Sequence, residues 1–176
     1  MTLSKQVVSP GMYRAELGVE RPGAGGELLF TRKEFRFTDG VNVAVHREAD
    51  QKWFGMFAPG AGHASGLLVG TIPSQLLVVS RGALYAVNAL DPENYDVYDD
   101  WVDGALSSDD GSILVYWNPW KIAAFNEHGP LWEGPFIADG FRDVAIDGSD
   151  VVGVAYVPGR GDVSFRLDVT TGVPYA

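Results

Sequence analysis

The sequence has no cysteine and only three histidines. Without cysteine, the chain can form no disulfide framework and has no thiolate nucleophile or thiolate metal ligand. It also lacks any run approaching the roughly 20 apolar residues of a membrane-spanning helix. The first six residues contain no apolar stretch of the kind found in a secretory signal. We therefore expect a cytoplasmic protein with no membrane segment.

Positive charge is also scarce, because 13 lysines and arginines stand against 23 aspartates and glutamates, a net charge of −10. Binding to duplex nucleic acid depends on basic side chains that neutralise phosphates, so this class of partner is not expected. A negative net charge favours solubility or binding to a basic partner protein. Solubility alone is sufficient to account for the charge.

Hydrophobic residues make up 46% of the chain and aromatic residues 12%, a composition that excludes a disordered chain. The 176 residues suffice for one domain with a sizeable core. The 22 glycines and 10 prolines interrupt the apolar segments often, as short strands joined by turns require. Composition therefore predicts a single β domain over residues 1–176.

The second half of the chain repeats one short β unit. Apolar runs begin at residues 76, 113 and 151, which are 37 and then 38 residues apart, and a second apolar run comes after each of them. A fixed period of this length is typical of stacked supersecondary units that cannot bury their faces alone. The predicted repeat units are 75–110, 111–147 and 148–176.

Turn signals recur in step with these runs. Asp103-Gly104 is matched by Asp139-Gly140, and Asp110-Gly111 is matched by Asp147-Gly148. Aspartate followed by glycine favours a tight turn because both residues tolerate positive φ. Residues 1–74 follow the period weakly, so we interpret them as a degenerate N-terminal part that contains one poor copy of the unit.

Within this N-terminal part, strands are expected where apolar and polar residues alternate. The expected strands are Val7-Val8, Tyr13–Leu17, Phe35–Phe37, Val41–Val45 and Trp53–Phe57, with a hairpin turn at Asp39-Gly40. Residues 58–74 are rich in glycine, but neither a Gly-Lys-Ser/Thr motif nor a strand–loop–helix context accompanies them. A break in the strands, with a plain mobile loop, is the prediction there.

The segment 91–103 carries six acidic residues and no basic one. An aspartate followed by proline at its start suits a short helical turn. The repeat register favours a last strand near Tyr95–Trp101 instead, matching Leu131–Ile137 in the next unit. The chain is expected to end on a closing strand at Val173–Tyr175.

The C-terminal part contains, in this order, an aspartate–glycine turn, a short strand, a glycine-containing strand, a phenylalanine-x-leucine-aspartate segment and a final threonine–glycine turn. The residues are Asp139-Gly140, Val144–Ile146, Val152–Ala155, Phe165–Asp168 and Thr171-Gly172. This order resembles the blade units of propeller proteins with quinoprotein-like or WD-type repeats, and small bacterial proteins that share it. The resemblance implies an all-β fold of antiparallel propeller-like blade repeats, three clear and one degenerate. A closed propeller has four or more blades, so a twisted β-sandwich or an open sheet array is the alternative.

No group of residues points to catalysis. His46, His63 and His128 lie in different elements, without the spacing of a zinc site. The acidic turns lack the ladder of ligands that a calcium loop needs. Glu133 and Asp139 would suit a glycosidase only at a defined separation across a cleft. We expect no metal, no cofactor and no enzymatic activity.

Aromatic residues beside an acidic segment have the profile of interface anchors. Trp117 and Trp120 flank a turn, so at least one of the two rings is expected at the surface. The candidate partner-binding residues are Asp96, Tyr98, Asp99, Asp100, Trp101, Asp103, Trp117 and Trp120.

The sequence therefore predicts a non-enzymatic protein-binding module. Its concrete form is an immunity or antitoxin-like protein that neutralises a basic effector through an acidic aromatic face. The alternative is a carbohydrate-binding or glycoside-hydrolysing β domain that uses the tryptophans together with Glu133 and Asp139. Neither nucleic acid nor a membrane is expected as a partner.

Overall fold

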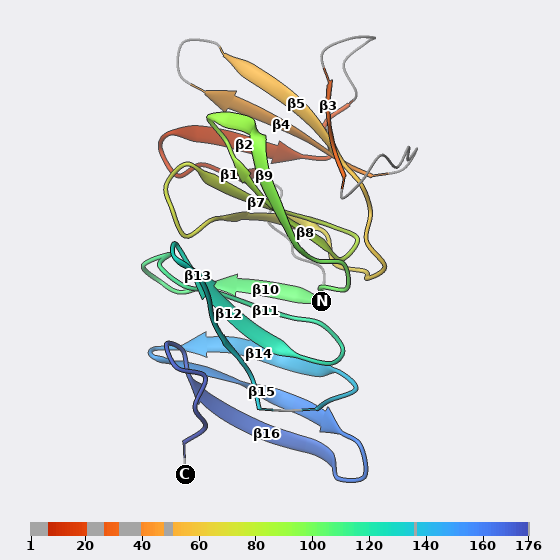
Figure 1. The fold of residues 1–176 in the computed structure, drawn as a ribbon, viewed down its shortest axis with the longest axis vertical. Helices are drawn as coiled ribbons and strands as arrows, with labels where there is room; N and C mark the ends of the chain where they lie inside the picture. The colour runs from red at the N-terminus through yellow and green to blue at the C-terminus, as the bar shows by residue number, and fades with distance from the viewer. Residues whose placement is uncertain (1–6, 21–26, 32–39, 48–50, 136, 176) are drawn as a thin grey trace. The chain divides into compact units, whose positions relative to one another are not determined.

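The structure is a computed structural model that describes residues 7–20, 27–31, 40–47, 51–135 and 137–175 (Figure 1). Every regular element within these ranges is a β-strand, so the fold is all-β, as predicted. The chain divides into two compact units, Met1–Val102 and Asp103–Ala176, which we describe separately. Phe35–Phe37 and Asp39, for which a strand and a turn are predicted, lie outside the described residues.

The first sheet has five strands in the order β1-β2-β4-β5-β3. Its strands are β1 (Val7–Val8), β2 (Tyr13–Leu17), β3 (Glu27–Phe30), β4 (Val41–Arg47) and β5 (Lys52–Phe57). Neighbours pair antiparallel except β3, which pairs parallel with β5. The strands predicted from alternation at β1, β2, β4 and β5 are confirmed. The parallel pairing of β3 is a long-range arrangement that local alternation does not encode.

The second sheet of this unit is an antiparallel meander of four strands in chain order. Its strands are β6 (Gly66–Val69), β7 (Gln75–Ser80), β8 (Ala83–Asn88) and β9 (Asp91–Asp99). β6 corrects the predicted break, because Leu67 and Leu68 are buried and pair with β7. β9 confirms a strand instead of a helical turn in the acidic segment, although it begins at Asp91 and ends at Asp99.

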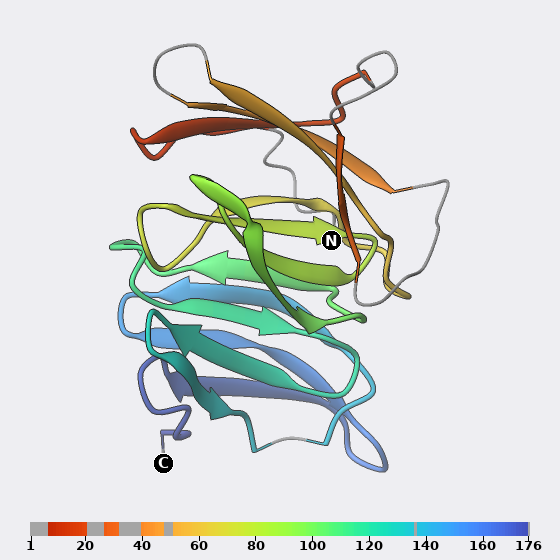
Figure 2. The same cartoon turned by 45° about the horizontal axis from the view of Figure 1, so that its top comes forward.

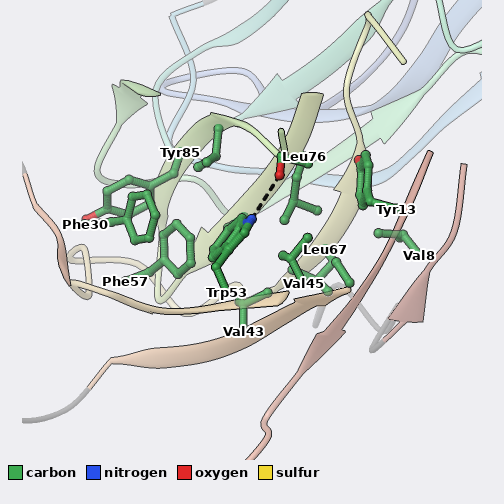
Figure 3. Packing of buried hydrophobic residues seen from close by; sticks show 14 of the residues in the cluster. Val8, Tyr13, Phe30, Val43, Val45, Trp53, Phe57, Leu67, Leu76 and Tyr85 are labelled. Carbon is green, nitrogen blue, oxygen red and sulfur yellow. Dashed lines mark hydrogen bonds between the residues drawn. The ribbon is translucent and has the colours of Figure 1, made fainter. Parts of the chain in front are cut away.

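Buried side chains from both of these sheets form the core of the first unit (Figure 3). Phe30 and Phe57 stack with ring centroids 4.2 Å apart, and Tyr85 meets Phe57 edge-on at 5.2 Å. The indole N–H of Trp53 donates to the carbonyl oxygen of Ala89 at 2.9 Å, shown as the dashed line in Figure 3. Each fully buried large side chain contributes about 1.5–3 kcal/mol, and this core holds the sheet that carries β9.

The second unit contains a sheet of four strands and a sheet of three, both antiparallel and in chain order (Figure 2, green to dark blue). The first comprises β10 (Gly104–Ser107), β11 (Leu114–Trp117), β12 (Ile122–Asn126) and β13 (Gly129–Glu133), and the second β14 (Phe141–Asp147), β15 (Asp150–Val157) and β16 (Gly161–Asp168). Side chains from both sheets form one core, with Trp117 and Ile122 on one side and Val151, Phe165 and Leu167 on the other.

Three expectations for this unit need correction. β10 begins at Gly104, where a turn is predicted, because Gly104 is paired with Trp117 and a side chain there would collide with the indole ring. β13 ends at Glu133 and does not reach Ile137. The predicted closing strand consists of a single bridge, between Leu167 and Pro174.

The sequence period corresponds to a recurring position in the last three sheets. The apolar runs that begin at residues 76, 113 and 151 fall on β7, β11 and β15, each the second strand of its meander. The second apolar runs fall on β8, β12 and β16, each the third strand. Asp110-Gly111 and Asp147-Gly148 both connect a first strand to a second. The recurrence of the sequence pattern is therefore a recurrence of structure.

Candidate functional site

The acidic segment forms the outermost strand of its sheet. Among the described residues, β9 pairs with β8 and with no strand on its other side. Tyr95 and Val97 are half-buried and pack against the core of the first unit. Asp91, Glu93 and Asp96 are exposed. β9 therefore presents carboxylates to solvent while its aromatic and apolar side chains hold it on the sheet.

Trp101 lies just after β9 in a turn that hydrogen bonds hold in place. Asp99 is buried, and its Oδ1 accepts a hydrogen bond from the Trp101 backbone N–H at 2.9 Å. The carbonyl oxygen of Asp100 accepts a backbone N–H from the glycine-rich loop at 2.8 Å. The Val102 N–H donates to the carbonyl oxygen of Gly82 at 2.9 Å. The Trp101 side chain is nonetheless 44% exposed, so an aromatic surface is held outward on a fixed backbone.

Glycines make the close packing of this turn possible. Gly82 has a φ of +93°, and a Cβ on it would lie 2.5 Å from the Gly62 nitrogen and 2.9 Å from the Asp100 carbonyl oxygen. Residues 58–65 are irregular, as predicted, but their backbone is bonded to neighbouring segments, with Ala61 donating to Asp100. The loop is thus part of the support of Trp101. Its glycine content is the only signal of this role in the sequence.

The first unit therefore brings together five of the predicted partner-binding residues in one continuous segment. Asp96 is exposed, and Tyr98, which lies where the register between β8 and β9 shifts, is half-buried. Asp99 is buried and Asp100 half-buried, and both fix the turn that carries Trp101. The predicted set omits Asp91 and Glu93, although the exposed surface of β9 includes both.

The second unit carries the other three predicted residues. Trp117 is buried, with 4% of its surface exposed, whereas Trp120 is 51% exposed. Between them, the buried Asn118 accepts hydrogen bonds on Oδ1 from the backbone N–H groups of Trp120 and Lys121, both at 2.9 Å. The Asp103 N–H donates to the Trp117 carbonyl oxygen at 2.9 Å. This turn therefore buries one indole and displays the other.

Other candidate residues have structural partners. The Trp132 indole N–H donates to the Val169 carbonyl oxygen at 2.9 Å, and Lys121 Nζ lies 3.6 Å from a carboxylate oxygen of the exposed Glu133. Asp110 accepts hydrogen bonds from Ser108 and Ser112, which lower its pKa to about 2. Within the described parts of the chain, no cluster of three or more histidine, aspartate or glutamate side chains could hold a metal ion.

Comparison with known proteins assigns this chain to no family. The chain matches no family model and no curated protein. Among the residues that the structure describes, no helix is long and apolar enough to cross a membrane.

Proposed function

We propose that this chain is a non-enzymatic protein-binding module that neutralises a basic partner protein, in the manner of an immunity protein or antitoxin. The observation that carries the proposal is Trp101, whose half-exposed indole extends from a backbone that hydrogen bonds hold in place at the end of an acidic edge strand. Large aromatic side chains dominate the binding energy of protein interfaces. A basic partner would meet the aromatic anchor and the carboxylates of β9 together.

The fixed backbone around Trp101 supports this role. Ordering a side chain or loop on binding costs free energy, so a segment that is already ordered binds with a smaller penalty. Three hydrogen bonds, made by the Asp99 side chain, the Asp100 carbonyl and the Val102 amide, order the turn before any partner arrives. Trp101 is therefore suited to packing into a desolvated pocket of the partner.

The carboxylates of β9 have a different task. Exposed charges attract a partner of opposite sign over a distance that salt shortens, and they act mainly on the association rate. Each such contact contributes no more than about 1 kcal/mol to affinity. Asp91, Glu93 and Asp96 would thus steer a basic protein toward Trp101 without dominating the affinity.

A second proposal concerns the architecture of the sheets. We propose that the three meanders are propeller-like blades and that the first sheet is their degenerate counterpart. The matching positions of β7, β11 and β15 in their sheets support this. Amide hydrogen exchange tests it: the interior strands β7, β8, β11, β12 and β15 should exchange more slowly than the edge strands of the same meanders. Uniform exchange across each sheet would contradict a blade-like unit.

The binding proposal is tested by affinity capture at low salt from cells that express the protein. The wild-type chain is compared with Trp101→Ala and with a variant in which Asp91, Glu93 and Asp96 are replaced by their amides. The proposal predicts basic proteins that the wild type retains and both variants lose. The control neutralises three exposed carboxylates of the second unit, Asp109, Glu127 and Asp139, and should retain the same proteins. Equal loss in the control would show non-specific charge attraction and contradict the proposal.

A sugar panel titrated against intrinsic tryptophan fluorescence provides the opposing test. A saturable response to a sugar, lost on replacement of Trp132 or Glu133, would favour the carbohydrate-binding alternative and overturn the protein-binding proposal. The proposal predicts no saturable response.

A further inference from the structure

The last strands of the three meanders differ in how well they are protected from pairing with another chain. β9 contains Pro92, and its pairing with β8 shifts register twice. β13 contains Pro130, and its pairing with β12 shifts once. β16 contains no proline and pairs with β15 over eight consecutive residues without a shift. Prolines and bulges protect sheet edges, so β16 is the last strand that has neither device, and the C-terminal tail pairs with its end alone.

The backbone of β16 directs alternate hydrogen-bonding groups away from β15. The Arg166 carbonyl oxygen accepts the Tyr175 N–H at 3.2 Å, and the Asp168 N–H donates to the Val173 carbonyl oxygen at 3.0 Å. Every second residue of a strand directs its N–H and C=O to the same side. Ser164 therefore directs its backbone groups to this side too, where no described residue pairs with them.

The side chains of β16 are complementary to a second copy of β16. Asp162, Ser164 and Arg166 are exposed and share one face of the strand, since Phe165 and Leu167 are buried on the other. In an antiparallel pair of two β16 strands centred on Ser164, Asp162 of each copy lies opposite Arg166 of the other copy. Opposite charges directly across two strands are stabilising, and like charges are destabilising.

The hydrogen-bond pattern fits the same centre. Ser164 directs its N–H and C=O outward, so Ser164 of one copy faces Ser164 of the other as a doubly bonded pair. On the opposite face, Val163 then lies across from Phe165, so that half-buried and buried apolar side chains meet. The positions of the charges and the directions of the backbone hydrogen-bonding groups thus independently favour the same register, with Ser164 opposite Ser164.

We propose that two copies of this chain associate through β16, antiparallel and about a two-fold axis at Ser164, to join two three-stranded sheets into one sheet of six strands. The contact is isologous and closes on itself. Tyr175 must leave the Arg166 carbonyl oxygen, and its bond there, at 3.2 Å, is longer than the 3.0 Å bond between Asp168 and Val173. A single strand pair buries little surface, so the dimer is transient. This proposal is independent of the partner-binding face on β9.

Analytical ultracentrifugation over a concentration series tests the contact. The wild type should shift from monomer to dimer as concentration rises, and Ser164→Pro should remain monomeric. Proline removes an N–H that β15 does not use, so the β15–β16 ladder is retained. Ser164→Thr keeps the N–H and should dimerise like the wild type. A wild type that stays monomeric at every concentration, or a Ser164→Pro variant that dimerises equally, overturns the proposal.

The register is tested by charge exchange. Asp162→Lys alone and Arg166→Glu alone each place like charges opposite one another in a homodimer, so each should dimerise several-fold more weakly than the wild type. An equimolar mixture restores opposite charges at both pairs, and heterodimers should form. Circular dichroism checks that each variant is folded, since Asp162 also contacts Arg142, and Arg166 contacts Asp150. Asp139→Lys, with the same charge change at an exposed site outside β16, should dimerise normally. A mixture no better than the single variants overturns the register.

Discussion

β9 and β16 are both last strands of antiparallel sheets, yet the order of charge along them differs. The 91–103 segment that contains β9 has acidic residues and no basic ones. β16 alternates in sign, with Asp162 and Arg166 on either side of Ser164. A strand of one charge sign repels its own copy and attracts a basic surface, whereas an alternating strand matches itself. The order of charges along an edge, more than their number, thus determines the kind of partner it suits.

The segments that come after the two strands also differ. β9 leads into a turn that packs on glycine backbone, with Gly82 and Gly62 in close contact with it. β16 leads into a tail that returns along its end, through the Leu167–Pro174 bridge and backbone bonds to Arg166 and Asp168, and leaves the backbone groups of Ser164 uncovered. The first region is built to hold one side chain still, and the second leaves an edge that a competing strand can reach.

The largest effect is expected from disturbing the rigid region. Gly82→Ala combines a positive φ, which costs an L-residue about 1–2 kcal/mol, with overpacking that costs about 1–3 kcal/mol. The free energy of unfolding should fall by about 2–5 kcal/mol, the sum of these two costs, measured by urea denaturation. Gly159→Ala is the matched control, because Gly159 has a φ of +77° but nothing within 4 Å of a Cβ. Equal decreases in the free energy of unfolding in the two variants would contradict close packing of Gly82 against Gly62 and Asp100.

Removal of the Trp101 side chain separates binding from stability. Trp101→Ala should weaken partner binding by about 2 kcal/mol or more, while the half-exposed indole contributes about 1–2 kcal/mol to folding. The change should appear as faster dissociation in surface plasmon resonance. Tyr156→Ala removes another aromatic ring, 51% exposed on β15, and should leave partner binding unchanged.

The tail beside β16 can be released without changing the strand. Tyr175→Pro removes the N–H that bonds the Arg166 carbonyl oxygen, and a net hydrogen bond contributes about 0.5–1.5 kcal/mol. Both copies release this bond in a two-fold dimer, so the self-association constant should rise about 5- to 100-fold, as about 1.4 kcal/mol corresponds to tenfold. Tyr175→Ala keeps the N–H and loses the same side chain, including the hydroxyl that donates to Asp168 Oδ2, and serves as the control. A lower association constant for the proline variant would show that the tail supports the contact instead of competing with it.

The end of β16 should also respond to acid. Hydrogen bonds from Thr170 and Thr171 lower the pKa of Asp168 to about 2 from its ordinary value of 3.8. The folded state therefore favours the carboxylate, and its stabilising contribution is present above pH 3.8 and lost as the pH falls toward 2. Thermal denaturation between about pH 5 and about pH 2 should show a steeper decline for the wild type than for Asp168→Asn.

The sequence predicts strands well where alternation and turn residues act locally. Tyr13–Leu17 is found as predicted, and the period of the apolar runs places β7, β11 and β15. β6 escapes prediction because a four-residue apolar run beside glycines resembles a loop until its partner strand is known. The parallel position of β3 depends on a contact with β5 that no neighbouring residue indicates.

The candidate site is predictable in part for the same reason. The acidic run and its strand character come from local pattern, so the location of β9 can be inferred. Which tryptophan of the 117–120 turn is buried cannot be inferred from local pattern. It depends on Gly104, which lies thirteen residues before Trp117 and pairs with it on the neighbouring strand. The hold on Trp101 likewise depends on Gly82, which is distant in sequence.

The central claim is that the acidic strand steers a basic partner and Trp101 holds it. Binding rates of a captured partner, measured at several salt concentrations, test this most directly. Neutralising Asp91, Glu93 and Asp96 should slow association and flatten its dependence on salt, with dissociation little changed. Trp101→Ala should speed dissociation about 30-fold, the equivalent of roughly 2 kcal/mol, at every salt concentration. Unchanged association in the first variant together with unchanged dissociation in the second would contradict the claim.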